Sequence, residues 1–417
     1  MREMKASGIE WCGNIPISWS SKHNKYVMSK KKVICPKYHC EKILSLTMKG
    51  VIERDLDAGG KMPSSFDGYQ FVYPNNLLMC LFDYDVTPRC IGLVEQQGLV
   101  SPAYSQFVLN DGYYAPYYYY YYLLIDNTKE LLHLAKNLRH SFTEEQLGNI
   151  NVPVPPFEEQ RKIVDFLDKK CAEIDALTAD IQTQIETLEE YKKSVITEAV
   201  TKGLDPNVEM KDSGVEWIGK IPASWNSHPL YYYFDERKNR NFDLRERNLL
   251  SLSYGNIIKK DINTTGGLLP ASFNTYNIVK NLDIIIRPTD LQNDKKSLRT
   301  GLVKEKIGII TSAYIALKPR EGVFSNYFHY LLHSYDIMKV FYNMGNGVRQ
   351  GLNYSEFSKL ILVAPSLEEQ HKIADFLDKK CAEIDQTISE KQQQFETLAE
   401  YKKSLIYEYI TGKKEVA

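Results

Sequence analysis

One run of eleven residues, DFLDKKCAEID, occurs twice without a change, at residues 165–175 and 375–385. The flanking runs PPFEEQRKIV and ETLEEYKKS recur beside it as PSLEEQHKIA and ETLAEYKKS, at the same offset of 210 residues. A second element, EMKASGIEWCGNIPISW at residues 3–19, returns as EMKDSGVEWIGKIPASW at residues 209–225. Solenoid repeats have periods of roughly 20–50 residues. The longer period here predicts that each copy is a full domain with a connector.

The repeat is cyclic, because the element that opens the chain recurs directly after the first connector. This order predicts two halves related by a pseudo-twofold axis. Repetition alone could serve only stability through stacking. The connectors, however, are nearly identical, whereas the segments between them retain only weak echoes, such as PSSF against PASF and VSPAY against ITSAY. That contrast favours a constant frame that holds two variable segments.

Both connectors are predicted to be long helices. No glycine or proline occurs between residues 157 and 200, and the opening Pro-Phe-Glu-Glu is typical of a helix start. Ser366 and Glu369 form a capping-box pattern in the second copy. A helix of about 44 residues spans roughly 66 Å. The apolar stripe comprises Ile163, Leu167, Cys171, Ile174, Leu177, Ile181, Ile185, Leu188, Tyr191 and Val195, and in the second copy Ile373, Leu377, Cys381, Ile384, Ile388, Phe395, Leu398 and Leu405.

Such a stripe requires a partner helix. A homodimeric coiled coil or the core of a bundle would provide one. Two matching copies in one chain favour intramolecular, antiparallel pairing instead. The predicted domains are 1–150 and 206–360, with helical spacers at 151–205 and 361–417. The fold class is therefore two copies of an α/β (α+β) domain joined by two long antiparallel coiled-coil helices.

The two large segments mix β-branched and aromatic runs with turn residues, a pattern that predicts strands at 76–82, 282–287 and 306–317. Tyrosine occupies all six positions 117–122, which could stack on bases. The run aligns with Tyr-Phe-His-Tyr-Leu-Leu at 327–332, an amphipathic helix pattern. We therefore favour a helix whose tyrosines mostly pack in the core.

The net charge of −1 conceals an uneven distribution. Lysine and arginine outnumber aspartate and glutamate by 21 to 14 in residues 211–360, whereas the counts are 16 and 15 in residues 1–150. The spacers are acidic, with 7 against 13 in residues 151–210 and 8 against 11 in residues 361–417. Positive charge therefore concentrates in residues 211–360 and negative charge in the two spacers. Local charge, rather than the total, decides whether a surface attracts phosphate.

Polar loops of these segments carry cations and short hydrogen-bonding side chains. Arginine can fork to guanine and asparagine or glutamine to adenine, whereas lysine and hydroxyls mostly grip phosphate. Each residue could equally be an ordinary solvated side chain. The candidates are Lys49, Arg54, Lys61, Ser64, Ser65, Tyr69, Arg89 and Arg139 in the first segment, and Lys259, Lys260, Ser272, Asn274, Tyr276, Arg287, Lys295, Lys296, Arg299, Arg349 and Gln350 in the second.

No chemistry of the chain's own is predicted. No phosphate-binding GxxxxGK[ST] loop, no amino-methyltransferase [ND]PPY run and no GxGxxG fingerprint occurs. Cys35, His39 and Cys40 lie close together, but no second ligand pair follows, so no metal site is expected. Seven scattered cysteines predict reduced thiols in the cytoplasm. No secretory signal and no apolar run long enough to span a membrane is present.

With these motifs in hand, the chain resembles the specificity (S) subunit of type I restriction-modification systems. The paired SG(I/V)EW-x-G-x-IP-x-SW and P-x-x-EEQ-x-KI-x-x-FLD-x-K motifs carry the resemblance, which extends over essentially the whole chain. It implies two target-recognition domains that each read half of a bipartite site in double-stranded DNA, with the helices setting the spacer. The family frame maps onto Gly8, Trp11, Glu159, Gln160, Gly214, Trp217, Glu369 and Gln370.

The resemblance also implies partners. Two methylation subunits would use S-adenosylmethionine to methylate adenine, and two motor-nuclease restriction subunits would use ATP and Mg²⁺. These cofactors would bind the partners, and this chain would be non-catalytic. Two other readings remain open on the sequence: a coiled-coil scaffold or adaptor that binds no DNA, and an independent enzyme, which the missing motifs disfavour.

Overall fold

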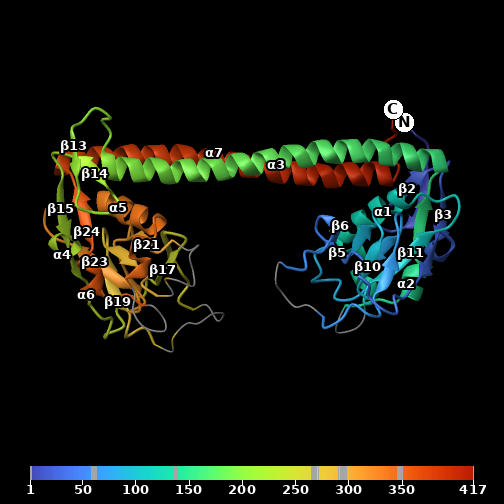
Figure 1. Cartoon of the computed structure of the whole chain (residues 1–417), viewed down its shortest axis with the longest axis horizontal. Coiled ribbons are helices and arrows are strands. Elements are labelled where there is room, and N and C mark those ends of the chain that lie inside the picture. Colours follow the sequence, from blue (N-terminus) through green and yellow to red (C-terminus); the bar gives the residue numbers. More distant parts are fainter. Residues whose placement is uncertain are drawn as a thin grey trace. The chain divides into compact units, whose positions relative to one another are not determined.

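The same series of helices and strands forms twice along the chain (Figure 1). The computed structural model describes residues 2–57, 63–135, 140–263, 270, 272–289, 291, 298–344 and 351–416. Contacts divide the chain into unit 1, Met1–Gln182 with Gln393–Ala417, and unit 2, Thr183–Gln392. This division cuts both long helices, so the four domain boundaries expected from the sequence remain predictions.

Unit 1 takes its sheets from twelve strands within the described residues. They are β1 (Met4–Ile9), β2 (Gly13–Pro16), β3 (Ser20–His23), β4 (Met28–Lys31), β5 (Leu44–Thr47), β6 (Gly50–Glu53), β7 (Gln70–Val72), β8 (Leu77–Met79), β9 (Ile91–Leu93), β10 (Gly98–Val100), β11 (Ser105–Leu109) and β12 (Asn151–Val154). The helices are η1 (Asn24–Tyr26), α1 (Ala115–Thr128), η2 (Glu130–Leu134), α2 (Glu144–Asn149) and α3 (Phe157–Lys202), which continues into unit 2.

Unit 2 repeats this order. Its described strands are β13 (Met210–Asp212), β14 (Lys220–Pro222), β15 (Asn226–Pro229), β16 (Phe234–Glu236), β17 (Leu250–Ser253), β18 (Asn256–Lys259), β19 (Asn277–Lys280), β20 (Ile284–Ile286), β21 (Thr300–Leu302), β22 (Ile307–Ile310), β23 (Ile315–Pro319) and β24 (Ile361–Ala364). Its helices are α4 (Leu230–Tyr233), α5 (Ser325–Ile337), η3 (Val340–Asn343), α6 (Tyr354–Phe357) and α7 (Leu367–Ile410), which continues into unit 1.

The sheet topology of the two units is the same. A four-stranded antiparallel sheet has the order β4-β11-β8-β9 in unit 1 and β16-β23-β20-β21 in unit 2. Two-stranded pairs surround it in both, namely β1-β2, β3-β12, β5-β6 and β7-β10 against β13-β14, β15-β24, β17-β18 and β19-β22. The predicted class, two mixed α/β domains with long helices, is therefore confirmed. The predicted strand 306–317 is instead two strands, because the backbone turns at Thr311, whose carbonyl accepts from the Tyr314 amide at 3.2 Å.

The long helices begin as their sequences predict. Acidic residues follow Pro156 in the first turn of α3, and the Ser366 hydroxyl accepts from the Glu369 amide at the start of α7. In unit 1, α3 and α7 pack antiparallel: Phe166 contacts Tyr409, and Asp175 pairs with Lys402 at 2.6 Å. In unit 2, Lys192 pairs with Asp385 at the same distance of 2.6 Å.

The apolar stripe on α3 differs from the prediction at two positions. Ile174 and Ile181 are buried, but Leu177 is 54% exposed and Tyr191 is 48% exposed. A coiled-coil seam advances alternately by three and four residues. It therefore passes from Ile174 through half-buried Thr178 to Ile181, and Leu177 lies beside it on the solvent side.

Candidate DNA-recognition site

The junction between sheet and long helix has the same design in both units. In unit 1, the Trp19 indole donates to the Glu159 carboxylate at 2.9 Å. In unit 2, the Trp225 indole donates to Glu369 at 3.1 Å. Both indoles are buried, at 1% and 0% exposure. Each hydrogen bond ties the residue just before β3 or β15 to the first turn of a long helix.

The other predicted frame residues lie at the same two junctions. Gly8 and Gly214 have φ of +71° and +68°, a left-handed conformation that side chains disfavour, which explains glycine in both SG(I/V)EW motifs. Gln160 and Gln370 are buried and donate to the carbonyls of Pro155 and Pro365 at 2.9 and 3.0 Å. Trp11 donates to the Tyr121 hydroxyl at 3.1 Å, and Trp217 contacts Tyr335 edge-on.

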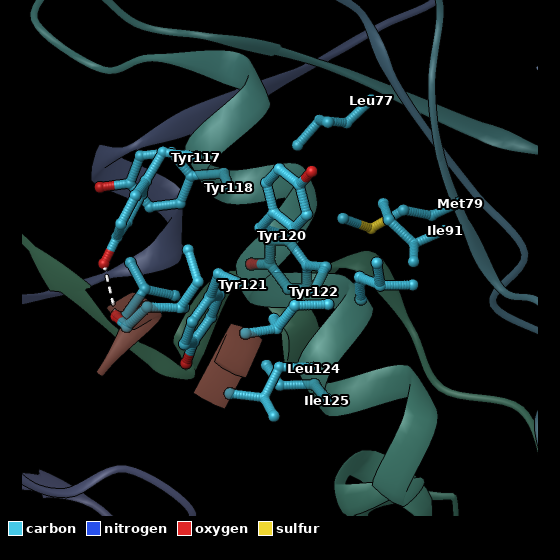
Figure 2. Packing of buried hydrophobic residues seen from close by; sticks show 14 of the residues in the cluster. Leu77, Met79, Ile91, Tyr117, Tyr118, Tyr120, Tyr121, Tyr122, Leu124 and Ile125 are labelled. Carbon is cyan, nitrogen blue, oxygen red and sulfur yellow. Dashed lines mark hydrogen bonds between the residues drawn. The ribbon is translucent and has the colours of Figure 1, made fainter. Parts of the chain in front are cut away.

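The tyrosine run forms the packed helix α1, as favoured from the sequence (Figure 2). Tyr117, Tyr118 and Tyr121 have 0% exposure, and Tyr117 donates to the Ile410 carbonyl of α7 at 2.8 Å. Tyr120 donates to Asp168 of α3 at 2.8 Å. Burial raises the pKa of the Tyr117 and Tyr121 hydroxyls well above the ordinary value. These rings hold the long helices and offer no open stacking platform.

Helix α5 repeats these contacts in unit 2. Tyr327 donates to the Val200 carbonyl of α3 at 3.2 Å, and Tyr330 donates to Asp378 of α7 at 2.6 Å. The matching residues in unit 1 are Tyr117 and Tyr120, each 210 positions earlier. Each unit therefore contacts the long helices through one tyrosine–backbone bond and one tyrosine–aspartate bond at matching positions.

Most predicted DNA contacts of unit 1 lie either at the β5–β6 hairpin or in the segment that precedes β7. Lys49 lies at the tip of the β5–β6 hairpin, and Arg54 directly follows β6. Ser64 and Ser65 are exposed, whereas Tyr69 is half-buried against Phe66 at a ring distance of 5.2 Å. Arg89 lies apart from both, where it donates to Asn127 at 3.2 Å and reaches Asp126 at 3.6 Å.

The corresponding residues of unit 2 lie at the corresponding places. Lys259 and Lys260 end the β17–β18 hairpin, where Lys259 pairs with Glu305 at 3.0 Å. Ser272 and Asn274 are exposed, and Tyr276 is half-buried against Phe273. Arg287 follows β20 and is half-buried.

Arg299 requires a correction. It has 0% exposure, its Nε donates to the Tyr342 hydroxyl at 3.0 Å, and its guanidinium also donates to the Thr289 carbonyl. Its amide donates to Asp336. The side chain is part of the core of unit 2 and offers no surface to DNA. Six further candidates lie outside the described residues: Lys61, Arg139, Lys295, Lys296, Arg349 and Gln350.

Neither a metal centre nor a membrane helix emerges from the described part of the chain. No group of three or more His, Cys, Asp or Glu side chains there could hold a metal ion. Cys35 is buried and donates to the Lys37 carbonyl at 3.1 Å, away from any ligand set. All seven cysteines are free thiols. No helix among those residues is long and apolar enough to cross a membrane.

The chain thus consists of two copies of a mixed α/β domain, each docked on the long helices α3 and α7. The family model for the type I restriction modification DNA specificity domain matches residues 104–187 and 254–396, over half of the chain. The chain therefore belongs to this family. The specificity subunit is the non-catalytic component of type I restriction-modification complexes.

Two similar proteins come from Methanocaldococcus jannaschii. One is named as the type I restriction enzyme MjaX specificity subunit and is 26% identical over 292 residues, which cover 66% of this chain and 62% of that protein. The other, the type I restriction enzyme MjaVIII specificity subunit, is 27% identical over 288 residues, or 64% of this chain and 63% of that protein. The matches thus span less than two thirds of either relative.

Solved structures share the fold. One chain, from work on complex assembly and conformational transition of the type I R-M system, matches with a TM-score of 0.69 at 14% identity, covering 96% of this chain and 99% of that chain. The HsdS subunit from Thermoanaerobacter tengcongensis matches with a TM-score of 0.52 at 14% identity, covering 96% and 98%. At this identity the likeness concerns the fold alone.

Proposed function

We propose that the chain is the sequence-reading subunit of a type I restriction-modification complex, in which each unit reads one half of a bipartite target in double-stranded DNA. The observation that carries this proposal is the duplication itself. Identical topology and matched Trp–Glu junctions hold two domains whose surface loops differ. A constant frame with two different readers is what an asymmetric two-part site requires.

The long helices would serve as spacer and docking site. Their exposed faces are acidic, as the excess of 13 acidic over 7 basic residues in residues 151–210 indicates. Such faces repel phosphate and suit contacts with proteins. Two methylation subunits and two motor-nuclease restriction subunits would bind the frame in the cytoplasm. S-adenosylmethionine, ATP and Mg²⁺ would be held by those subunits rather than by this chain.

The DNA contacts would come from the candidates that the structure leaves exposed or half-buried, namely Lys49, Arg54, Ser64, Ser65, Tyr69, Lys259, Lys260, Ser272, Asn274, Tyr276 and Arg287. The candidates outside the described residues, Lys61, Arg139, Lys295, Lys296, Arg349 and Gln350, stay part of the proposal on their sequence alone. Lysines and hydroxyls would position the backbone of DNA, and arginines and amides would contact bases. Arg89 is engaged with Asp126 and is the weakest surface candidate. A scaffold without DNA binding finds no support in the family match.

The adenine methylome of a host with and without the gene tests this function. The expected difference is one motif with two defined parts separated by an undefined spacer. A second arm inserts a few residues at matched positions within 176–186 and 386–396. That insertion should lengthen the spacer and leave both half-sites unchanged. The absence of any gene-dependent motif would contradict the proposal.

A further inference from the structure

Each unit carries a two-stranded hairpin with one buried and one outward face. In unit 2, Leu250, Leu252 and Ile257 point inward from β17–β18. In unit 1, the matching residues of β5–β6 are Leu44, Leu46 and Val51. Successive side chains of a strand alternate between faces. The outward faces therefore carry Ser251, Ser253, Asn256, Ile258 and then Lys260 in unit 2, and Ser45, Thr47, Gly50, Ile52 and then Arg54 in unit 1.

Each hairpin packs closely against a glycine in an edge strand of the four-stranded sheet. A Cβ on Gly301 of β21 would lie 2.6 Å from Leu252 and 3.0 Å from Ile257. A Cβ on Gly92 of β9 would lie 2.5 Å from Val51 and 2.6 Å from Leu46. Glycine at both places allows this approach without displacing the ends of the aliphatic side chains. The outward faces thus lie in equivalent positions within their units.

The outward face of β17–β18 is polar and partly exposed: Ser251 and Ser253 are half-buried, as Arg54 is in unit 1. Asn256 and Lys260 are exposed, and Ile258 is 42% exposed. The tip residue Tyr254 is 82% exposed, and the corresponding tip of unit 1, Met48, is 61% exposed. Each outward face has one aliphatic side chain, which is too little apolar surface for the core of a stable protein–protein interface. Hydroxyl, amide and cationic groups in a row match the edges of bases and the phosphates beside them.

We propose that these two outward faces enter a groove of DNA and read bases, an inference that rests on the proposed function. Two strands lie about 4.8 Å apart, and the major groove, roughly 12 Å wide, admits such a ribbon. Asn256 is suited to adenine, and Arg54 to guanine. Asn256 now donates to the Tyr254 carbonyl at 3.3 Å, an exposed and long bond that a base edge can replace. The rows differ at Thr47/Ser253, Gly50/Asn256 and Arg54/Lys260, so the two half-sites would differ.

The test introduces Asn256→Ala and Arg54→Ala separately into the full complex and measures the methylome. Asn256→Ala should relax one base position in the half-site read by unit 2 and leave the other half unchanged. The preference at that position should fall roughly 10–100-fold, the effect of one two-bonded base contact. Arg54→Ala should relax the other half-site. Asn226→Ala, an exposed position on β15 outside the hairpin, is the matched control and should change neither.

A purely structural role predicts a different outcome. In that case Asn256→Ala would lower total methylation while the motif stayed the same, and the inference would be overturned. Asn256→Asp separates the two roles further. It keeps the size of the side chain but removes the amide donor, so it should move preference away from adenine. An unchanged motif in all three hairpin variants refutes the ribbon alone, whereas no bipartite motif from the unaltered chain refutes the proposed function.

Discussion

Helices α1 and α5 occupy the same place in their units, yet only part of their surface is the same. The residues that dock on the long helices, Tyr117 and Tyr120 against Tyr327 and Tyr330, make equivalent bonds. Between them, tyrosine at position 119 becomes histidine at position 329. The two units therefore share the tyrosine bonds to the long helices and differ at a position between them.

The interiors differ in the same way. Asn76 of unit 1 donates to Gln106 at 3.3 Å, in a cluster of neutral amides. The matching residue of unit 2 is Asp283, which has 0% exposure and accepts from Arg237 at 2.9 Å. Burial raises the pKa of the Asp283 carboxyl, and the hydrogen bond from Arg237 opposes that rise. The same fold thus tolerates a neutral network or a buried ion pair at one place.

The largest expected loss of stability comes from removing the ion pair between Arg237 and Asp283. Asp283→Ala leaves the charge of Arg237, whose side chain is 10% exposed, without its buried partner. The loss should destabilise unit 2 by about 3–5 kcal/mol. Asn76→Ala in unit 1 removes only neutral hydrogen bonds and should cost about 1–3 kcal/mol. Hydrogen exchange of the backbone amides in β20 measures the loss of stability in unit 2, and exchange in β8 measures the loss in unit 1. The double variant Asp283→Asn/Arg237→Met should recover most of the loss, and a double variant as unstable as Asp283→Ala would show that charge is not the cause.

The next largest loss of stability should differ between the Trp19–Glu159 junction and the Trp225–Glu369 junction. Glu159 accepts from Trp19 and also pairs with Arg2 at 2.6 Å, whereas Glu369 accepts from Trp225 without a matching arginine among its described ion pairs. Glu159→Ala should therefore cost about 2–3 kcal/mol, and Glu369→Ala about 1–2 kcal/mol. Chemical denaturation of the full chain, together with hydrogen exchange measured separately in each unit, gives the free-energy cost of each substitution. In an Arg2→Ala background the two costs should become equal, and a persistent difference would assign it to another contact.

The sequence predicted the elements whose pattern is local and long. The repeat, the long helices and the packing of the tyrosine run follow from offset, from missing helix breakers and from alignment with 327–332. Sequence-based prediction failed where tertiary contacts determine whether a side chain is buried. Arg299 looks like a surface cation, but Asp336 and Tyr342 bury it. Arg54 and Lys260 of the outward hairpin faces were predicted from the sequence, but Asn256 and the serines beside it were missed. The alternation of Ser251 and Ser253 with leucines was a signal, but four-residue strands are too short to distinguish from loops.

The smallest expected effect is a dependence on pH that only one unit should show. Burial, strengthened by nearby cations, lowers the pKa of His329 and His333 from 6.5 to about 3 and about 4. Lys304 faces His329, and Lys192 and Lys339 face His333. In the unfolded chain both imidazoles take up protons below about pH 6.5, but in the folded unit they do not. The stability of unit 2 should therefore fall as pH drops from 6.5 toward 4.

The size of this effect is limited because both side chains are only half-buried, so solvent screens them. We expect a loss of about 1 kcal/mol per histidine at pH 5, seen as faster hydrogen exchange in α5 than in α1. The matching residues of unit 1 are Tyr119 and Leu123, which carry no charge at this pH. Importing them as His329→Tyr with His333→Leu should abolish the difference between the helices. If α1 and α5 lost protection equally between pH 7 and pH 5, carboxylates common to both units would be the cause.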